Sequence, residues 1–297
     1  MNIEVQNNNI ILSDVRDFDL RHIFDCGQCF RFNAIGDGAY TGVAFDRPLT
    51  ISQTGDTVTL YETSERDFYD VWYDYFDFGN DYSLIKKRLS HGNAGNADNV
   101  MRQAVSYGGG IRILNQNLWE MIISFIISAS NNIPRIKGII ERLCAAFGEK
   151  REYMGSIYYT FPDAERMSSL TEDDLSVIRA GFRDKYILDA VNKFTSGELS
   201  VQYLNGLDTS EAKKALMSVK GIGNKVSDCI LLFGMKRTDS FPIDVWIKRI
   251  MEYCYFDGEP QTIDTVSKTA SKKFGELGGY AQQYLFFYAR EQRIGLD

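Results

Sequence analysis

Residues 216–253 have the sequence LMSVKGIGNKVSDCILLFGMKRTDSFPIDVWIKRIMEY, the most informative pattern in the chain. An apolar helix end precedes the turn Lys220–Gly223, whose two glycines fit unusual backbone dihedrals and a close approach to something bulky. A second helix is expected to open at Asn224, and its unpaired first amides provide a site for a phosphate. Asp244 follows nineteen residues after Lys225, just past a proline and before another amphipathic run. The stretch therefore predicts a helical hairpin with a lysine at the start of its second helix.

This pattern resembles the helix-hairpin-helix, Gly/Pro-rich loop and aspartate of the HhH-GPD superfamily of DNA glycosylases. The lysine in GIGNKVSDC is similar to that of the 8-oxoguanine DNA glycosylase/AP lyases, which excise 8-oxoguanine and then cut the strand. The resemblance implies that Lys225 attacks the sugar C1′ to form a Schiff base and that Asp244 stabilises the positively charged sugar. Burial in an apolar helix and the helix N-terminus both favour the neutral amine that this attack requires. By position alone these would be an ordinary solvated lysine and an ordinary helix cap.

A base that such an enzyme removes must leave the duplex and enter a pocket. Cys229 lies four residues after Lys225 and therefore on the same helix face. The resemblance implies that the carbonyl of Gly27 accepts the N7–H found on 8-oxoguanine, that Gln282 bonds the base edge and that Phe286 stacks on the base. Taken singly, each residue is more simply explained by core packing or a turn. Their joint occurrence in the family's order favours the functional interpretation.

The opposite strand is expected at the segment 128–135, SASNNIPR, which resembles the family's asparagine-rich loop that fills the gap left by the flipped base. The DNA-binding residues implied by the resemblance are Asn131, Asn132, Arg135, Phe182, Arg183, Gly221 and Gly223. Ser130 stands where the family has an asparagine and Phe182 where it has a wedge tyrosine, although phenylalanine can also intercalate. We therefore expect a weaker preference for cytosine opposite the lesion.

Charge is unevenly distributed along the 297 residues. The formal net charge of −7 argues against a protein that coats nucleic acid indiscriminately. However, residues 210–251 hold eight Lys/Arg against four Asp/Glu, a local charge of +4, and DNA binding depends on such a local face. Acidic residues concentrate in residues 62–81, which we expect to lie away from DNA. Only two histidines are present, so Ser-His-Asp chemistry is disfavoured.

The five cysteines suit reduced thiols in a cytosolic setting. Cys26 and Cys29 have metal-ligand spacing, but no second pair accompanies them. No cysteine follows Cys254, so the iron–sulfur cluster of some helix-hairpin-helix glycosylases should be absent. We expect no cofactor or metal, and the one long apolar run is too short to span a membrane. The expected partner is double-stranded DNA containing 8-oxoguanine, bound by a cytoplasmic monomer that would be nucleoid-associated in a bacterium.

The predicted fold class is α+β, with a small antiparallel sheet domain at residues 1–110 packed on a larger all-helical domain at residues 111–297. Short strand-like runs separated by turn signals are expected at 10–12, 30–32, 40–45, 49–53 and 57–61. Helices are expected at 18–24, 65–75, 84–89, 100–107, 118–130, 134–147, 185–194, 210–218, 224–233, 245–253, 266–274 and 280–291. A run of three glycines at 108–110 marks the predicted boundary.

Two other functions fit parts of the sequence. One is a helix-hairpin-helix glycosylase for another damaged purine, against which Gly27, Cys229 and Phe286 together favour 8-oxoguanine. The other is a non-catalytic helix-hairpin-helix module that only binds DNA. Lys225 and Asp244 argue against this module, because a phosphate clamp needs only the glycines of the hairpin.

Overall fold

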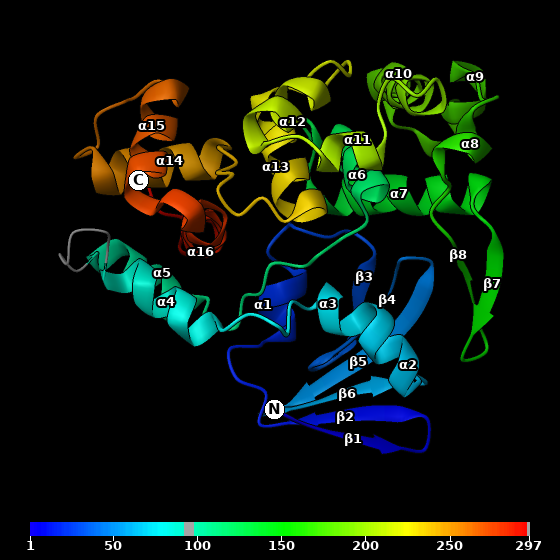
Figure 1. The fold of residues 1–297 in the computed structure, drawn as a ribbon, viewed down its shortest axis with the longest axis horizontal. Coiled ribbons are helices and arrows are strands. Elements are labelled where there is room, and N and C mark those ends of the chain that lie inside the picture. Colours follow the sequence, from blue (N-terminus) through cyan, green and yellow to red (C-terminus); the bar gives the residue numbers. More distant parts are fainter. Residues whose placement is uncertain (92–97, 296–297) are drawn as a thin grey trace.

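The computed structural model describes residues 1–91 and 98–295, which form an antiparallel sheet and a larger body of helices (Figure 1). The strands are β1 (Asn2–Gln6), β2 (Asn9–Ser13), β3 (Phe32–Gly36), β4 (Ala39–Ala44), β5 (Arg47–Thr54) and β6 (Thr57–Tyr61). They pair in the order β1-β2-β6-β5-β4-β3, every neighbour antiparallel. Alternate residues such as Leu49 and Ile51 are buried, because successive side chains of a strand point to opposite faces. The predicted α+β class is confirmed.

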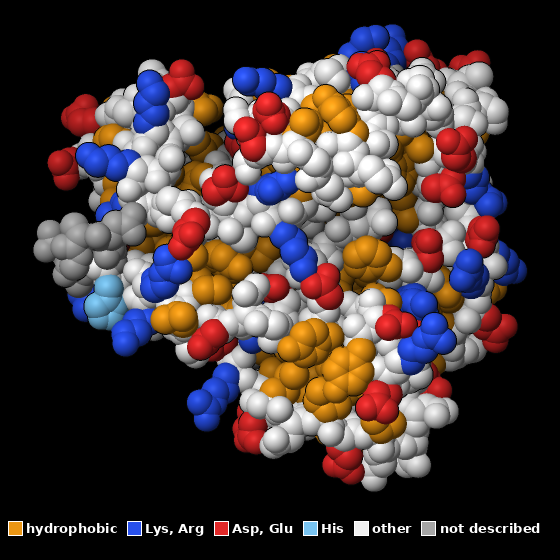
Figure 2. Space-filling view, in the orientation of Figure 1, with side chains coloured by type: hydrophobic (Ala, Val, Ile, Leu, Met, Phe, Trp, Pro, Cys, Tyr) orange, Lys and Arg blue, Asp and Glu red, His pale blue; other side chains and the backbone are white. Residues whose placement is uncertain are grey.

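Short helices cover one face of the sheet and complete its core. They are α1 (Leu20–Phe24), α2 (Glu65–Asp67), a π-helical segment (Phe68–Trp72) and α3 (Tyr73–Tyr75). Phe24 stacks on Phe32 with ring centroids 4.3 Å apart, and Trp72 is fully buried. The single α-helix predicted at 65–75 is therefore interrupted by a π-helical turn. Figure 2 shows hydrophobic side chains grouped over this lower part of the molecule, with acidic side chains around them.

The helical body is built around α6 (Leu118–Ser128), in which every residue is buried. Before it come α4 (Tyr82–His91) and α5 (Asn99–Tyr107). After it come α7 (Ile133–Phe147), α8 (Ala164–Met167), α9 (Glu172–Leu175), the 3-10 turns Ser176–Ile178 and Gly181–Arg183, α10 (Asp184–Thr195), α11 (Val201–Asn205), α12 (Thr209–Leu216), α13 (Asn224–Met235), α14 (Val245–Tyr255), α15 (Ile263–Phe274), a third 3-10 turn (Gly275–Leu277) and α16 (Gly278–Gln292). Helix starts are fixed locally: Asn117 caps α6, and Asp208 forms a capping box with Glu211 on α12.

A β-hairpin interrupts the region predicted to be all-helical, which corrects that prediction. Strands β7 (Lys150–Tyr153) and β8 (Ser156–Tyr159) are joined by Met154 and Gly155, both with positive φ. The hairpin extends from the helical body toward the sheet (Figure 1). There the Tyr153 hydroxyl donates to the carbonyl of Tyr61 at 2.9 Å. Its strands are short and mostly exposed, so their sequence has no clear alternation of apolar and polar residues.

Two hydrophobic clusters underlie the two parts of the fold. One lies between the sheet and its short helices, and the other fills the helical body. Residues of α4 and α5, such as Leu89 and Met101, belong to the second cluster although they precede residue 110. Among the described residues, no helix is long and apolar enough to cross a membrane.

Candidate active site

The turn between α12 and α13 requires glycine at one of its two glycine positions. Gly221 has φ +83°, and a Cβ there would lie 2.3 Å from Cδ2 of Tyr186 on α10. Gly223 has an extended backbone, and a Cβ there would meet open space. It is also the N-cap of α13 and supplies no side chain to the first amides of the helix. These amides are therefore left for an external acceptor such as a phosphate.

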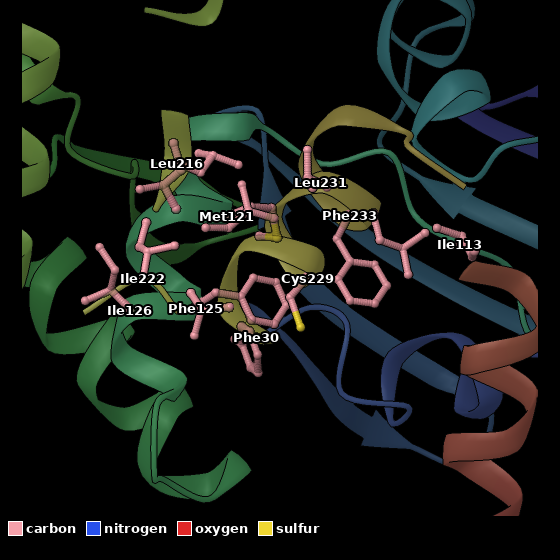
Figure 3. Close-up of a cluster of buried hydrophobic side chains, with 14 of the residues drawn as sticks. Phe30, Ile113, Met121, Phe125, Ile126, Leu216, Ile222, Cys229, Leu231 and Phe233 are labelled. Atoms are coloured by element: carbon pink, nitrogen blue, oxygen red, sulfur yellow. The ribbon is translucent and has the colours of Figure 1, made fainter. Parts of the chain in front are cut away.

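Lys225 is the second residue of α13, and its side chain is half-buried. Its Nζ lies 5.4 Å from the centre of the Phe125 ring, over the face of that ring. Phe125 in turn packs edge-on against Phe30, at 5.7 Å, and stacks on Phe233, at 5.6 Å. Figure 3 shows Phe30, Phe125 and Phe233 in one cluster, with Phe233 extending from α13. The amine thus stands at the edge of an apolar core that limits its contact with water.

Asp244 is the N-cap of α14. Its Oδ1 accepts from the backbone amides of Trp246 at 3.0 Å and Ile247 at 2.8 Å. Burial raises the pKa of this carboxyl, whereas the Ile247 amide and the charge of Lys225 act to lower it. The amides hold one oxygen and fix the carboxyl orientation. Capping and an electrostatic role toward Lys225 are therefore compatible in one side chain.

Cys229 lies one helical turn after Lys225 and is only 4% exposed. Burial raises the pKa of its thiol to about 11, against the opposing effect of the Lys225 charge. The group is therefore a neutral thiol at pH 7. The Asp244 charge acts on the same thiol. The structure thus brings Lys225, Cys229 and Asp244 within electrostatic reach of one another.

The residues expected to recognise the base come from both ends of the chain. Gly27 has φ +78°, and a Cβ there would lie 3.5 Å from Cε1 of Phe286 and 3.7 Å from Cδ1 of Ile133. Gly27 and Phe286 are therefore neighbours in space. Gln282, one turn before Phe286 on α16, is 4% exposed, and its Oε1 accepts from Nε2 of Gln283 at 2.9 Å.

Local hydrogen bonds hold the loop between α6 and α7. Asn132 is the N-cap of α7 and accepts the Arg135 amide at 3.0 Å, while Asn131 donates to the Ile127 carbonyl at 3.1 Å. Ser130 adopts a left-handed conformation with φ +50°. The Arg135 side chain is exposed, as is Phe182, which is 59% exposed in the 3-10 turn before α10. An exposed aromatic beside such a loop has the form expected of a wedge.

Arg183 differs from its neighbour because only 2% of it is exposed. Its guanidinium donates to the carbonyls of Ala129 and Ala180, both at 3.0 Å, and of Ser130 at 3.1 Å. These bonds tie the 3-10 turn to the end of α6 and engage Nε, Nη1 and Nη2 of the guanidinium. Its contacts therefore support a role in shaping the loop, and the direct contact with DNA stays a prediction.

Cys26 and Cys29 are buried in different hydrophobic clusters despite their spacing. Burial raises the pKa of both thiols, to about 12 for Cys26. All five cysteines are free. Within residues 1–91 and 98–295, no group of three or more His, Cys, Asp or Glu is placed to hold a metal ion.

Three residues around the site were not anticipated from the sequence. Phe125 supports the lysine, Ile133 lies against Gly27, and Tyr186 fills the space beside Gly221. Phe125 belongs to a run expected only to form a buried helix. No local pattern marks any of the three, because their roles depend on which helices pack together.

Comparison with known proteins covers both parts of the fold. Residues 10–122 match the N-terminal domain of 8-oxoguanine DNA glycosylase, and residues 123–276 match the HhH-GPD superfamily base excision DNA repair proteins. A probable N-glycosylase/DNA lyase of Methanothermobacter thermautotrophicus is 30% identical over 207 residues, 63% of this chain and 65% of that protein. This chain thus matches slightly less than two thirds of that relative's length.

The solved structures that match almost the whole chain include two complexes with DNA. MBOgg1, solved in complex with a low affinity DNA ligand, is 46% identical over 98% of this chain and 99% of its own, with a TM-score of 0.94. The Clostridium acetobutylicum 8-oxoguanine glycosylase/lyase, solved with double-stranded DNA containing cytosine opposite 8-oxoguanine, is 40% identical over 99% of each chain, also with a TM-score of 0.94. The chain therefore belongs to the HhH-GPD superfamily of base excision DNA repair proteins and carries the N-terminal domain of 8-oxoguanine DNA glycosylase.

Proposed function

We propose that this protein is a bifunctional 8-oxoguanine DNA glycosylase and AP lyase. The observation that carries the proposal is the convergence of Lys225, Cys229 and Asp244 at the start of α13, beside an unfilled helix N-terminus. The hairpin amides bind a phosphate of the lesion strand, which places the sugar of the flipped nucleotide beside the lysine.

In the proposed reaction the neutral amine of Lys225 attacks C1′, and the bond between C1′ and the base nitrogen breaks. The electron pair leaves with the base, which takes up a proton. Asp244 stabilises the positive charge that develops on the sugar as this bond breaks. The adduct opens to a Schiff base, whose C2′ loses a proton and expels the 3′ phosphate, which nicks the strand. Lys225 leaves when water hydrolyses the imine.

One of the groups that contact the base, the Gly27 carbonyl, distinguishes 8-oxoguanine from guanine. The Gly27 carbonyl accepts the N7–H of 8-oxoguanine, whereas guanine presents a lone pair there and leaves the acceptor unpaired. Phe286 stacks on the ring and Gln282 bonds its edge. Cys229 contributes a neutral, polarisable thiol to the wall of the pocket beside Lys225.

The partner is double-stranded DNA with 8-oxoguanine, engaged by a monomer in the compartment that holds the DNA, the cytoplasm and its nucleoid in a bacterium. On the opposite strand, Phe182 enters the stack, while Asn131, Asn132 and Arg135 face the space left by the flipped base. Exposure of Phe182 and Arg135 supports this placement.

Borohydride trapping on an 8-oxoguanine:cytosine duplex tests the proposal. The native protein should form a covalent adduct, and Lys225→Gln should form none while still binding the duplex. Lys214→Gln provides a matched control, because this exposed lysine lies on the neighbouring α12 and its loss removes the same charge. Trapping that persists in Lys225→Gln would show that another group is the nucleophile.

A further inference from the structure

Damage recognition in the proposed function depends on two elements that the chain brings together from its opposite ends. Gly27 follows α1, and Phe286 lies on α16. One supplies an acceptor at the edge of the base and the other a surface under its face. The selectivity of a hydrogen bond is lost when its geometry shifts by about 1 Å. The spacing between the two elements therefore needs a physical restraint.

Arg290 provides contacts to both elements. It lies one turn after Phe286 on α16, and the carbon of its guanidinium is 5.3 Å from the centre of the Phe286 ring. The same guanidinium donates from Nη2 to the carbonyl of Asp25 at 2.6 Å, two residues before Gly27. Its side chain is only 21% exposed, so these contacts are partly shielded from water.

Asp25, which accepts the hydrogen bond from Arg290, is itself held in place. The Asp25 amide donates to the carbonyl of Arg21 at 3.0 Å and thereby ends α1. The Tyr40 hydroxyl donates to Oδ2 of the same aspartate at 3.1 Å, which ties it to the sheet. Restraint at Asp25 is therefore transmitted to the short segment that holds Gly27 in its left-handed conformation.

The Arg290 guanidinium is held in place as well. Glu291 pairs with the Arg290 guanidinium at 3.1 Å, and this pairing restricts its rotation. The guanidinium also lies 5.8 Å from the centre of the Phe287 ring, so the cation is held against two aromatic rings. These contacts fix where the guanidinium stands relative to Phe286.

We propose that Arg290 is a positioning residue that sets the spacing between the Gly27 carbonyl and the Phe286 ring, and with it the fit of 8-oxoguanine. This inference rests on the proposed function. Within the part of the chain that the structure describes, Arg290 contacts Asp25, Phe286, Phe287 and Glu291 and neither Lys225 nor Asp244, so its effect is confined to steps in which the base is present. Cleavage at an abasic site uses the same lysine but no base.

The experiment compares two substrates under single-turnover conditions: a duplex with 8-oxoguanine opposite cytosine and the same duplex with an abasic site. Arg290→Ala should release 8-oxoguanine roughly tenfold more slowly or worse, because the base is misaligned. Its cleavage of the abasic site should stay within about twofold of the native rate. Arg290→Lys keeps a charge and a donor and should recover part of the loss.

Arg293→Ala is the matched control, because it removes one exposed arginine near the same end of α16. It should leave both rates unchanged, which separates positioning from a general loss of positive charge. Thermal melting of each variant shows whether it is folded.

Three results would overturn the inference. Equal losses on both substrates would assign Arg290 to stability or DNA binding, and unchanged rates would assign it no role. A native protein that cleaves abasic sites but releases no 8-oxoguanine would overturn the proposed function and the inference together. Either of the first two results, obtained beside a native protein that is active on both substrates, would overturn the inference alone.

Discussion

The ring of Tyr186 occupies the space where a side chain on residue 221 would lie, with Cδ2 only 2.3 Å from an ideal Cβ. Gly221→Ala therefore faces both a steric clash and a left-handed backbone, which together cost about 2–5 kcal/mol. We expect a lower melting temperature and a large loss of duplex affinity, measured by thermal unfolding and by titration with a fluorescent duplex. Gly223→Ala, whose Cβ meets open space, should change the free energy of unfolding by about 1 kcal/mol or less. Equal destabilisation by both variants would contradict this account of the turn.

A substitution can separate the two roles of Asp244, which are to cap α14 and to stabilise positive charge on the sugar. Asn is a good N-cap, so Asp244→Asn should keep the free energy of unfolding within about 1 kcal/mol while removing the negative charge. Base release should slow by roughly 10²–10³-fold, measured by single-turnover excision. Because burial raises the pKa of this carboxyl, native base release should decline on the acid side at a higher pH than an exposed aspartate would give. Loss of folding in Asp244→Asn would favour a purely structural cap.

Glu120 should make stability depend on pH. Burial raises the pKa of its carboxyl to about 7, against the charge of Arg31, while the charges of Asp46 and Glu141 add to the rise. The native state then binds the proton more tightly than the unfolded chain, so this contribution is full below the ordinary glutamate pKa and is lost as pH rises through about 7. It amounts to about 3 kcal/mol at most. The melting temperature of Glu120→Gln relative to the native protein should therefore increase from pH 5 to pH 8; a constant difference would exclude this effect.

Ser130 and Phe182 lead to a prediction about the opposite base. The native protein should discriminate less between cytosine and the other three bases opposite 8-oxoguanine than a variant with Ser130→Asn and Phe182→Tyr. The asparagine adds donors and acceptors that can read a base edge, and the tyrosine adds a hydroxyl to the wedge. Excision rates on four duplexes that differ only in the opposite base measure this. Strong and equal rejection of the other three bases by the native protein would count against it.

Local patterns were sufficient for most of the fold. The helices predicted at 210–218 and 224–233 correspond to α12 (Thr209–Leu216) and α13 (Asn224–Met235). The signals are local, because Asp208 caps α12 and both helices show apolar periodicity along their own residues. The strand predicted at 30–32 begins instead at Phe32, since Phe30 turns into the helical core against Phe125. Strand β1 was not predicted, because its residues are almost all exposed at the sheet edge.

The residues of the site also fall into those that a local motif predicts and those whose contacts come from distant segments. Lys225 and Asp244 stand in one continuous motif and could be assigned roles from it. The burial of Arg183 and the contact of Arg290 with Asp25 could not be predicted, because each depends on carbonyls supplied by a distant segment. The direct contact with DNA predicted for Arg183 rests on its place in the family's order and stays a prediction.

The buried Arg183 has a consequence for how this protein would survey undamaged DNA. A loop that is already held by an arginine loses little conformational freedom when it meets a duplex, so each encounter costs little entropy. Such encounters can then be brief and numerous, and nothing in the loop must refold before the next one. An arginine buried beneath the loop would in this way increase the number of base pairs tested in a given time.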